Sequence, residues 1–146
     1  MYNLMKRKIV WLCSSITLLS GLIAMPALAD VAVITNPGSG VSTASSGDVK
    51  ALFLGKSKTI AGKSLTPVEQ KSGGARGSFN DKVLGKSDSQ LKAYWTKLLF
   101  SGKGSPPKGL ENDAAVKAHV AANPKSIGYI DSAAVDGTVK VILTVK

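Results

Sequence analysis

The only long apolar run of this chain, Ile9 to Met25, lies within its first 30 residues and fixes how much sequence is left to fold. Three basic residues at positions 6–8 precede the run, and Ala27-Leu28-Ala29 follows it. A basic start, an apolar middle and an A-x-A ending are typical of a secretory signal peptide. We therefore expect residues 1–29 to be a cleaved signal peptide and residues 30–146 to form one exported domain, with an uncleaved membrane anchor as the alternative. Such a leader on a small protein indicates the periplasm.

The remaining sequence excludes several classes of site. The 146 residues less these 29 leave 117, enough for a single domain with one core. No second apolar run is long enough to span a membrane. Cys13 is the only cysteine and lies in the leader, so we expect no disulfide, no thiolate metal site and no cysteine nucleophile. His119 is the only histidine, which makes a Ser-His-Asp triad or a His-rich metal site hard to build. We expect neither an enzyme nor a cofactor.

The charge pattern argues against nucleic-acid binding. Of the 19 Lys and Arg, three fall in residues 1–29, which leaves 16 against nine acidic residues. The lysines are spread along the chain. They are not interleaved with aromatic residues, whereas single-strand-binding proteins combine basic residues with aromatic side chains that stack on the bases. We interpret them mainly as a solvated surface.

Apolar periodicity predicts alternating strands and helices. Expected strands cover residues 31–35, 66–69, 127–131 and 139–145, and expected helices cover the region of Val49 to Phe53 and residues 75–84, 87–99 and 113–122. The helix after Ser87 is the best marked, because Ser87 and Gln90 fit a capping box and five apolar residues follow at helical spacing. Residues 56–64 and 102–109 are expected to be loops. This order predicts an α/β domain with helices packed on a small mixed sheet.

One arginine stands apart from the lysines. Arg76 is the only arginine after the leader, and it follows Ser72-Gly73-Gly74-Ala75 at an expected helix start. Glycines allow successive N–H groups to point at one ligand, and a helix N-terminus favours an anion. The guanidinium fork matches two oxygens of a phosphate or carboxylate. A solvated glycine-rich turn is the plainer interpretation of the same residues.

Three segments together resemble the phosphate-binding proteins of bacterial ABC phosphate importers, which are class II periplasmic binding proteins. The matching stretches are Asp48 to Gly55, Thr66-Pro67-Val68 followed by Ser72 to Phe79, and Ile127-Gly128-Tyr129. They correspond to the helix, the strand with its loop-helix, and the later strand of that family. The resemblance extends from Val31 to about Val141, and it implies a single lobe of a protein that normally has two.

The resemblance also implies a ligand site. It places an oxyanion ligand, phosphate or a relative, at Ser72, Gly73, Gly74, Ala75, Arg76, Gly77 and Ser78. Gly73 and Ala75 stand where the family has Ser and Thr, so two hydroxyl donors are replaced. An ABC permease, a second lobe or a second copy would be the protein partner. The alternative is a periplasmic interaction or sensor module of the same fold that has lost solute transport.

Overall fold

A computed structural model describes residues 30–146, so the expected signal peptide at 1–29 lies outside the described residues. The strands are β1 (Val31–Thr35), β2 (Thr59–Ile60), β3 (Lys63–Ser64), β4 (Thr66–Gln70), β5 (Lys108–Leu110), β6 (Ser126–Asp131) and β7 (Lys140–Val145). The α-helices are α1 (Ser46–Phe53), α2 (Gly74–Phe79), α3 (Asp88–Phe100) and α4 (Asp113–Ala122). Short 3-10 turns cover Pro37–Ser39 and Ser132–Ala134, and a π-helical turn, Asn80–Leu84, continues α2. None of the helices in residues 30–146 is both long and apolar enough to cross a membrane.

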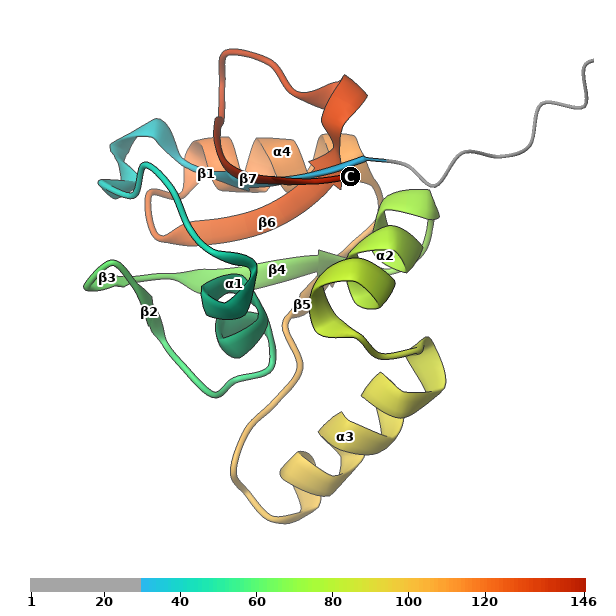
Figure 1. The fold of residues 1–146 in the computed structure, drawn as a ribbon. Helices are drawn as coiled ribbons and strands as arrows, with labels where there is room; N and C mark the ends of the chain where they lie inside the picture. Colours follow the sequence, from blue (N-terminus) through green and yellow to red (C-terminus); the bar gives the residue numbers. More distant parts are fainter. Residues whose placement is uncertain (1–29) are drawn as a thin grey trace, which may run out of the picture.

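Five strands form one mixed sheet in the order β5-β4-β6-β1-β7 (Figure 1). β4 runs parallel to β5 and β6, whereas β1 runs antiparallel to both β6 and β7. The carboxyl ends of β4, β5 and β6 therefore meet at one edge of the sheet. Asp30 and the end of β7 lie at this same edge, because Val31 pairs with both Asp131 and Val145. α2 and α4 begin at this edge.

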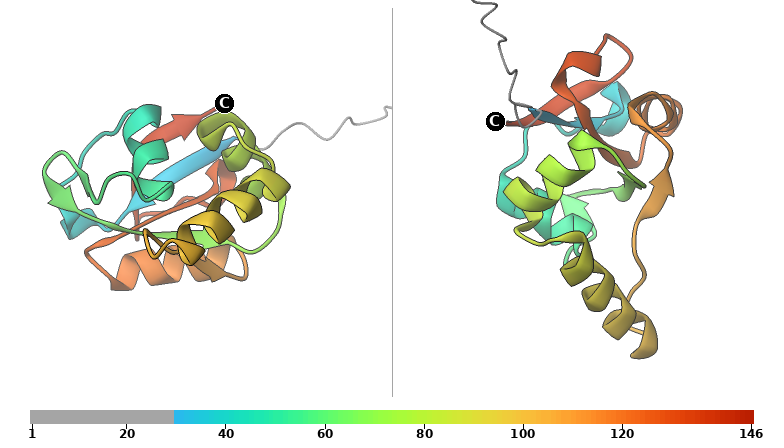
Figure 2. Two further views of the ribbon diagram at one scale, coloured as in Figure 1. Left: turned by 90° about the horizontal axis from the view of Figure 1, so that it is seen from below. Right: turned by 90° about the vertical axis from the view of Figure 1, so that its right-hand side faces the viewer.

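Alternate residues of β1 enter two separate cores. Val31 and Val33 pack with α1, α2 and α3 on one face of the sheet, while Ala32 and Ile34 pack with α4 on the other. A run of buried apolar residues with no polar alternation is what a strand covered on both faces requires. Three aromatic rings fill the first core, where Phe79 stacks on Tyr129 at 4.0 Å between centroids and Phe53 meets Phe79 edge-on at 4.8 Å. Figure 2 shows the helices on opposite sides of the sheet.

α4 lies unusually close to the sheet. A Cβ on Gly128 of β6 would lie 2.6 Å from Val116 Cγ1 and 3.1 Å from Val68 Cγ2, so only glycine allows this approach. The far end of α4 is held by Asn36, whose side-chain amide donates to the carbonyls of Val120 and Ala121 at 3.1 and 2.8 Å. The position of α4 is thus fixed at its middle and at its end.

The structure confirms the predicted α/β class and most of the elements. β1 and α4 have the predicted bounds, α3 begins with the predicted Ser87–Gln90 capping box, and the predicted helix at 75–84 is the α2 segment with its π-helical continuation. Two predicted loops were wrong in part. Residues 56–64 hold the β2–β3 hairpin, which turns at Ala61 and Gly62 with φ of 49° and 75°, and residues 102–109 run into β5.

The apolar side of α3 is narrower than predicted. Leu91 and Trp95 are buried, and Tyr94 is half-buried with its hydroxyl donating to the Leu54 carbonyl at 2.6 Å. Leu99, predicted to lie on the buried side, is 54% exposed. The reason is that the last turn of α3 extends past the rest of residues 30–146, so no other helix or strand in this part of the chain covers Leu99 (Figure 2).

Candidate functional site

The glycine-rich loop joins the end of β4 to the start of α2, at the carboxyl edge of the sheet. The backbone N–H of Lys71 donates to the Leu110 carbonyl at 2.9 Å, which ties the start of the loop to β5. Gly73 then adopts φ 106° and ψ 172°, a conformation that side chains strongly disfavour. The loop therefore turns sharply into α2 at the one position where glycine is needed.

α2 begins without a side-chain cap. Gly73 at the N-cap position has no side chain to accept a hydrogen bond, and the first backbone bond of the helix is from Gly77 N–H to the Gly73 carbonyl at 3.2 Å. The N–H groups of Gly74, Ala75 and Arg76 precede that bond, as the first donors of any helix do. Within residues 30–146, three backbone donors at the positive end of a peptide dipole are thus left for an acceptor from outside the helix.

The Arg76 side chain is already engaged by groups on β4 and α3. Its Nε donates to Asp88 Oδ1 at 3.0 Å, and its Nη1 donates to the Gln70 carbonyl at 2.5 Å and lies 3.3 Å from Glu69 Oε1. The side chain is only 17% exposed. These contacts hold the guanidinium in one orientation and leave Nη2 without a partner among the described contacts.

The electrostatics of this group are set by burial and by charge pairing. Burial raises the pKa of the Glu69 carboxyl, and Arg76 beside it opposes that rise without cancelling it. Burial alone would lower the pKa of Arg76, but the carboxylates of Glu69 and Asp88 outweigh it and hold that pKa above its usual value. Arg76 is therefore a permanent cation whose charge is largely balanced by two carboxylates.

A network of polar contacts joins the residues next to the glycine-rich loop to the neighbouring strands and to α4. The Gln70 amide group donates to Asp113 Oδ1 at 2.5 Å and to the Tyr129 carbonyl at 3.1 Å, while the Gln70 N–H donates to the Tyr129 hydroxyl at 3.1 Å. Asp113 also accepts from the Asp131 N–H at 3.2 Å, and Lys71 pairs with Glu111. The ends of β4, β5 and β6 and the start of α4 are thus joined to the loop.

The seven predicted site residues occupy one loop and one helix but differ in access. Ser72, Gly73, Gly74 and Gly77 are exposed, Arg76 is half-buried, and Ala75 and Ser78 are buried. The Ser78 hydroxyl has no hydrogen-bond partner among the described residues. The exposed side of the group consists of backbone atoms and Ser72, with Arg76 at its edge.

Sequence reasoning missed the acidic partners of Arg76 and Gln70. Glu69, Asp88 and Asp113 come from β4, α3 and α4, and nothing in their local sequence marks them as neighbours of the loop. The only available signal was the position of these residues relative to the predicted strands. Glu69 ends a predicted strand, and Asp113 would have been placed at the same edge had β5 been predicted.

Comparison with solved structures identifies the architecture. The described fold matches an ABC-type phosphate transport receptor from Vibrio cholerae at 20% identity, with a TM-score of 0.62 over 79% of this chain and 46% of the receptor. It matches a Clostridium perfringens protein assigned as a phosphate ABC transporter substrate-binding protein, with bound phosphate, at 22% identity and a TM-score of 0.59, over 79% of this chain and 45% of that one. PstS from Borrelia burgdorferi matches at 14% identity and a TM-score of 0.56, over 78% and 47% of the two chains.

These matches show the fold. The chain spans less than half the length of each of these proteins and has the architecture of a single lobe of a solute-binding protein. No protein-family model and no curated protein matches the sequence.

Proposed function

We propose that this protein is an exported, non-enzymatic binding protein for phosphate or a related oxyanion, linked to ABC-type phosphate uptake. The observation that carries the proposal is the uncapped start of α2, with the N–H groups of residues 74–76 presented next to Arg76. The fold supports it, because the structural neighbours named above are phosphate receptors. The site would consist of Ser72, Gly73, Gly74, Ala75, Arg76, Gly77 and Ser78.

In this site the backbone amides would carry most of the contact. The N–H groups of Gly74 to Arg76 would each donate to an anion oxygen, the Ser72 hydroxyl would add a fourth donor, and Arg76 Nη2 would approach from the side. The buried Ser78 hydroxyl could contribute only after a small shift of α2. A buried phosphate needs partners for all of its oxygens, so the opposite face would come from a second lobe, a second copy or a permease.

The carboxylates beside Arg76 limit the affinity. A phosphate placed at the loop would be attracted by the Arg76 guanidinium and repelled by the carboxylates of Glu69 and Asp88. At close range the repulsion is comparable in size to the attraction. We therefore expect weak binding by the isolated chain, and we expect neutralisation of Glu69 to strengthen it.

The same contacts favour a second candidate function. An arginine whose hydrogen bonds are taken up by Glu69, Gln70 and Asp88 serves the fold without any ligand. An interaction or sensor module that has lost solute transport would keep these contacts. A binding protein would bind phosphate or a related oxyanion at this loop, and an interaction module would not.

Calorimetric titration of the purified protein with phosphate and with sulfate at low salt tests the proposal. We expect weak binding that Arg76→Ala abolishes and that Glu69→Gln strengthens several-fold. Lys97→Ala, which removes one exposed charge from α3, is the matched control and should bind as the wild type does. Equal binding by the wild type and Arg76→Ala, or no heat with any variant, would overturn the proposal and favour the interaction module.

A further inference from the structure

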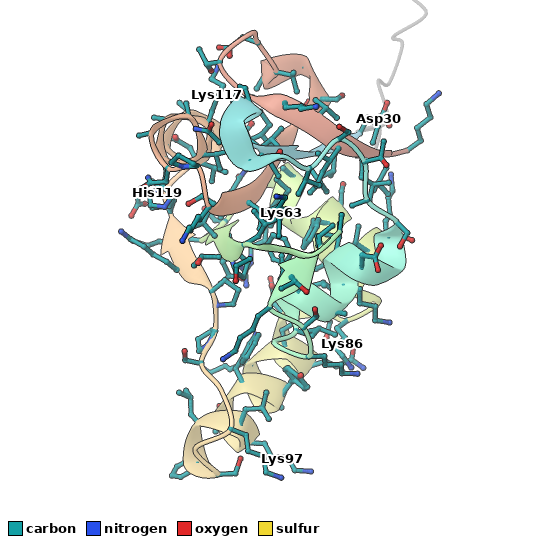
Figure 3. All side chains as sticks on the ribbon, turned by 90° about the vertical axis from the view of Figure 1, so that its left-hand side faces the viewer. Asp30, Lys63, Lys86, Lys97, Lys117 and His119 are labelled. Carbon is teal, nitrogen blue, oxygen red and sulfur yellow. The ribbon has the colours of Figure 1, made fainter. Side chains whose placement is uncertain are left out.

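Two large apolar side chains are exposed at the far end of α3. Leu99 is 54% exposed and Phe100 is 88% exposed. Within residues 30–146, these two are the large apolar side chains that face solvent. Lys97, on the same last turns of α3, lies at the opposite end of the molecule from Asp30 (Figure 3). Apolar side chains of this size are unfavourable in water, so a partner that covers them gains their burial.

A cavity opens at Trp95, one helical turn before Leu99 on α3. It has a volume of about 480 Å³ and lies between the end of α1, the start of β4, α3 and the loop that returns from α3 to β5. Its floor is apolar, with Phe53, Leu65 and Trp95 buried beneath it. Trp95 is held between two glycines, since a Cβ on Gly55 or Gly104 would lie within 3.4 or 3.8 Å of its ring. Large flanking side chains are thus absent on both sides of the indole, and its ring is left as a wall of the cavity.

The rim of the cavity is positively charged. Lys58, Lys103 and Lys108 line it, and none of its lining residues is acidic. The sequence around it agrees, because residues 89–110 contain four lysines and no acidic residue. These three lysines make no ion pair within residues 30–146. The charge is therefore available to a partner.

We propose that this end of the molecule is a docking site for an acidic protein segment that carries a large apolar side chain. We call it the tip surface and define it by Lys58, Trp95, Leu99, Phe100, Lys103 and Lys108. The apolar side chain would enter the cavity against Trp95. Neighbouring residues of the segment would cover Leu99 and Phe100 at the end of α3, and its carboxylates would pair with the three lysines.

The shape and charge of the tip surface favour this occupant. A cavity of this volume holds one or two large side chains, which a peptide segment can insert while its flanking residues reach the rim. A second copy of this chain would bring an excess of lysine to a rim that is already cationic. The cavity lies at the start of β4 and the glycine-rich loop follows the other end of that strand, so both sites can be occupied together (Figure 1).

Selection from a displayed library of random peptides tests the docking site even though the natural partner is unidentified. The bait is the full chain with Trp11→Phe, which leaves Trp95 as its only tryptophan. We expect enriched peptides to combine an aromatic or large aliphatic residue with two or more acidic residues. Binding of a synthetic version should shift the Trp95 emission.

Variants show whether the peptides use the tip surface. Lys58→Gln, Lys103→Gln and Lys108→Gln combined, and separately Phe100→Ser, should each weaken binding at least tenfold. The matched control combines Lys50→Gln, Lys125→Gln and Lys146→Gln, three exposed lysines outside the tip surface, and should leave binding within about twofold of the wild type. Circular dichroism confirms the fold of each variant, which is expected because all these side chains lie on the surface.

Four outcomes of the peptide and sedimentation experiments would overturn the proposal. They are no enrichment, enriched peptides that lack acidic residues, binding that the triple Lys→Gln variant retains, and a Phe100-dependent dimer in sedimentation, which would assign the tip surface to a second copy. Tip-lysine-dependent binding to vesicles of mixed phosphatidylglycerol and phosphatidylcholine, without binding of any acidic peptide, would likewise overturn it and assign the surface to a membrane. None of these readouts involves Arg76, so failure here leaves the proposed anion site untouched.

Discussion

Gly128→Ala tests whether the close approach of α4 to β6 is built into the fold. The added methyl would lie 2.6 Å from Val116 Cγ1, 3.1 Å from Val68 Cγ2 and 3.4 Å from Val120 Cγ2. Carbon atoms in ordinary contact lie about 3.5–4.0 Å apart, so α4 must move away by about 1 Å. Overpacking of this kind costs about 1–3 kcal/mol. Asn36 at the end of α4 opposes the movement, so we expect a value in the upper half of that range.

A double-mutant cycle with Val116→Ala isolates the cause of this destabilisation. Val116 is fully buried, and its truncation alone should cost about 2 kcal/mol through lost burial and the cavity left behind. In the double variant the methyl added at position 128 would occupy part of that cavity. We therefore expect the combined loss to be smaller than the sum of the two single losses by at least about 1 kcal/mol.

Urea unfolding followed by circular dichroism measures all four free energies of unfolding. Additive losses, or a Gly128→Ala variant as stable as the wild type, would refute the steric argument. The result bears on the site as well, because Asp113 at the start of α4 holds Gln70 beneath the glycine-rich loop.

Three further predictions rest on single contacts. Asn36→Ala removes both amide bonds to the end of α4 and should lower the free energy of unfolding by about 2 kcal/mol in urea titrations. Ser87→Ala removes the cap of α3 and should cost about 1 kcal/mol by the same measurement, with Ser101→Ala as a control of little effect. Burial raises the pKa of Tyr129 to about 12, so the protein should lose about 2–3 kcal/mol as pH rises from about 10 through 12, a loss that Tyr129→Phe should abolish. Unchanged alkaline stability in the wild type would contradict the burial of that hydroxyl.

The elements that could be predicted are those whose signal is local. Three such signals each lie within a few residues of the element they predict. They are the apolar run at residues 31–35, the capping box at Ser87 and Gln90, and Asn123-Pro124 at the end of α4. β5 has no such signal, because Lys108–Leu110 becomes a strand only by pairing with β4. The β2–β3 hairpin is two residues long on each side and is too short to show a period.

The position of the glycine-rich loop in the fold could be predicted, but the contacts around it could not. The glycines and Arg76 mark the loop because they are adjacent in sequence, and the structure places them at the carboxyl edge of the sheet. The charge balance there depends on Glu69 and Asp88, which reach Arg76 from two other elements. Tertiary pairing of this kind leaves no trace in the local pattern, and it changes the expected affinity for an anion.

The most direct test of oxyanion binding at the glycine-rich loop is a phosphate titration followed by ¹H–¹⁵N NMR of the backbone amides. The account predicts saturable shifts concentrated at Gly74, Ala75 and Arg76, with the Arg76 Nε resonance moving at the same concentrations. Arg76→Ala should abolish saturation. Shifts confined to exposed lysines and their neighbours, without saturation at residues 74–76, would contradict the account.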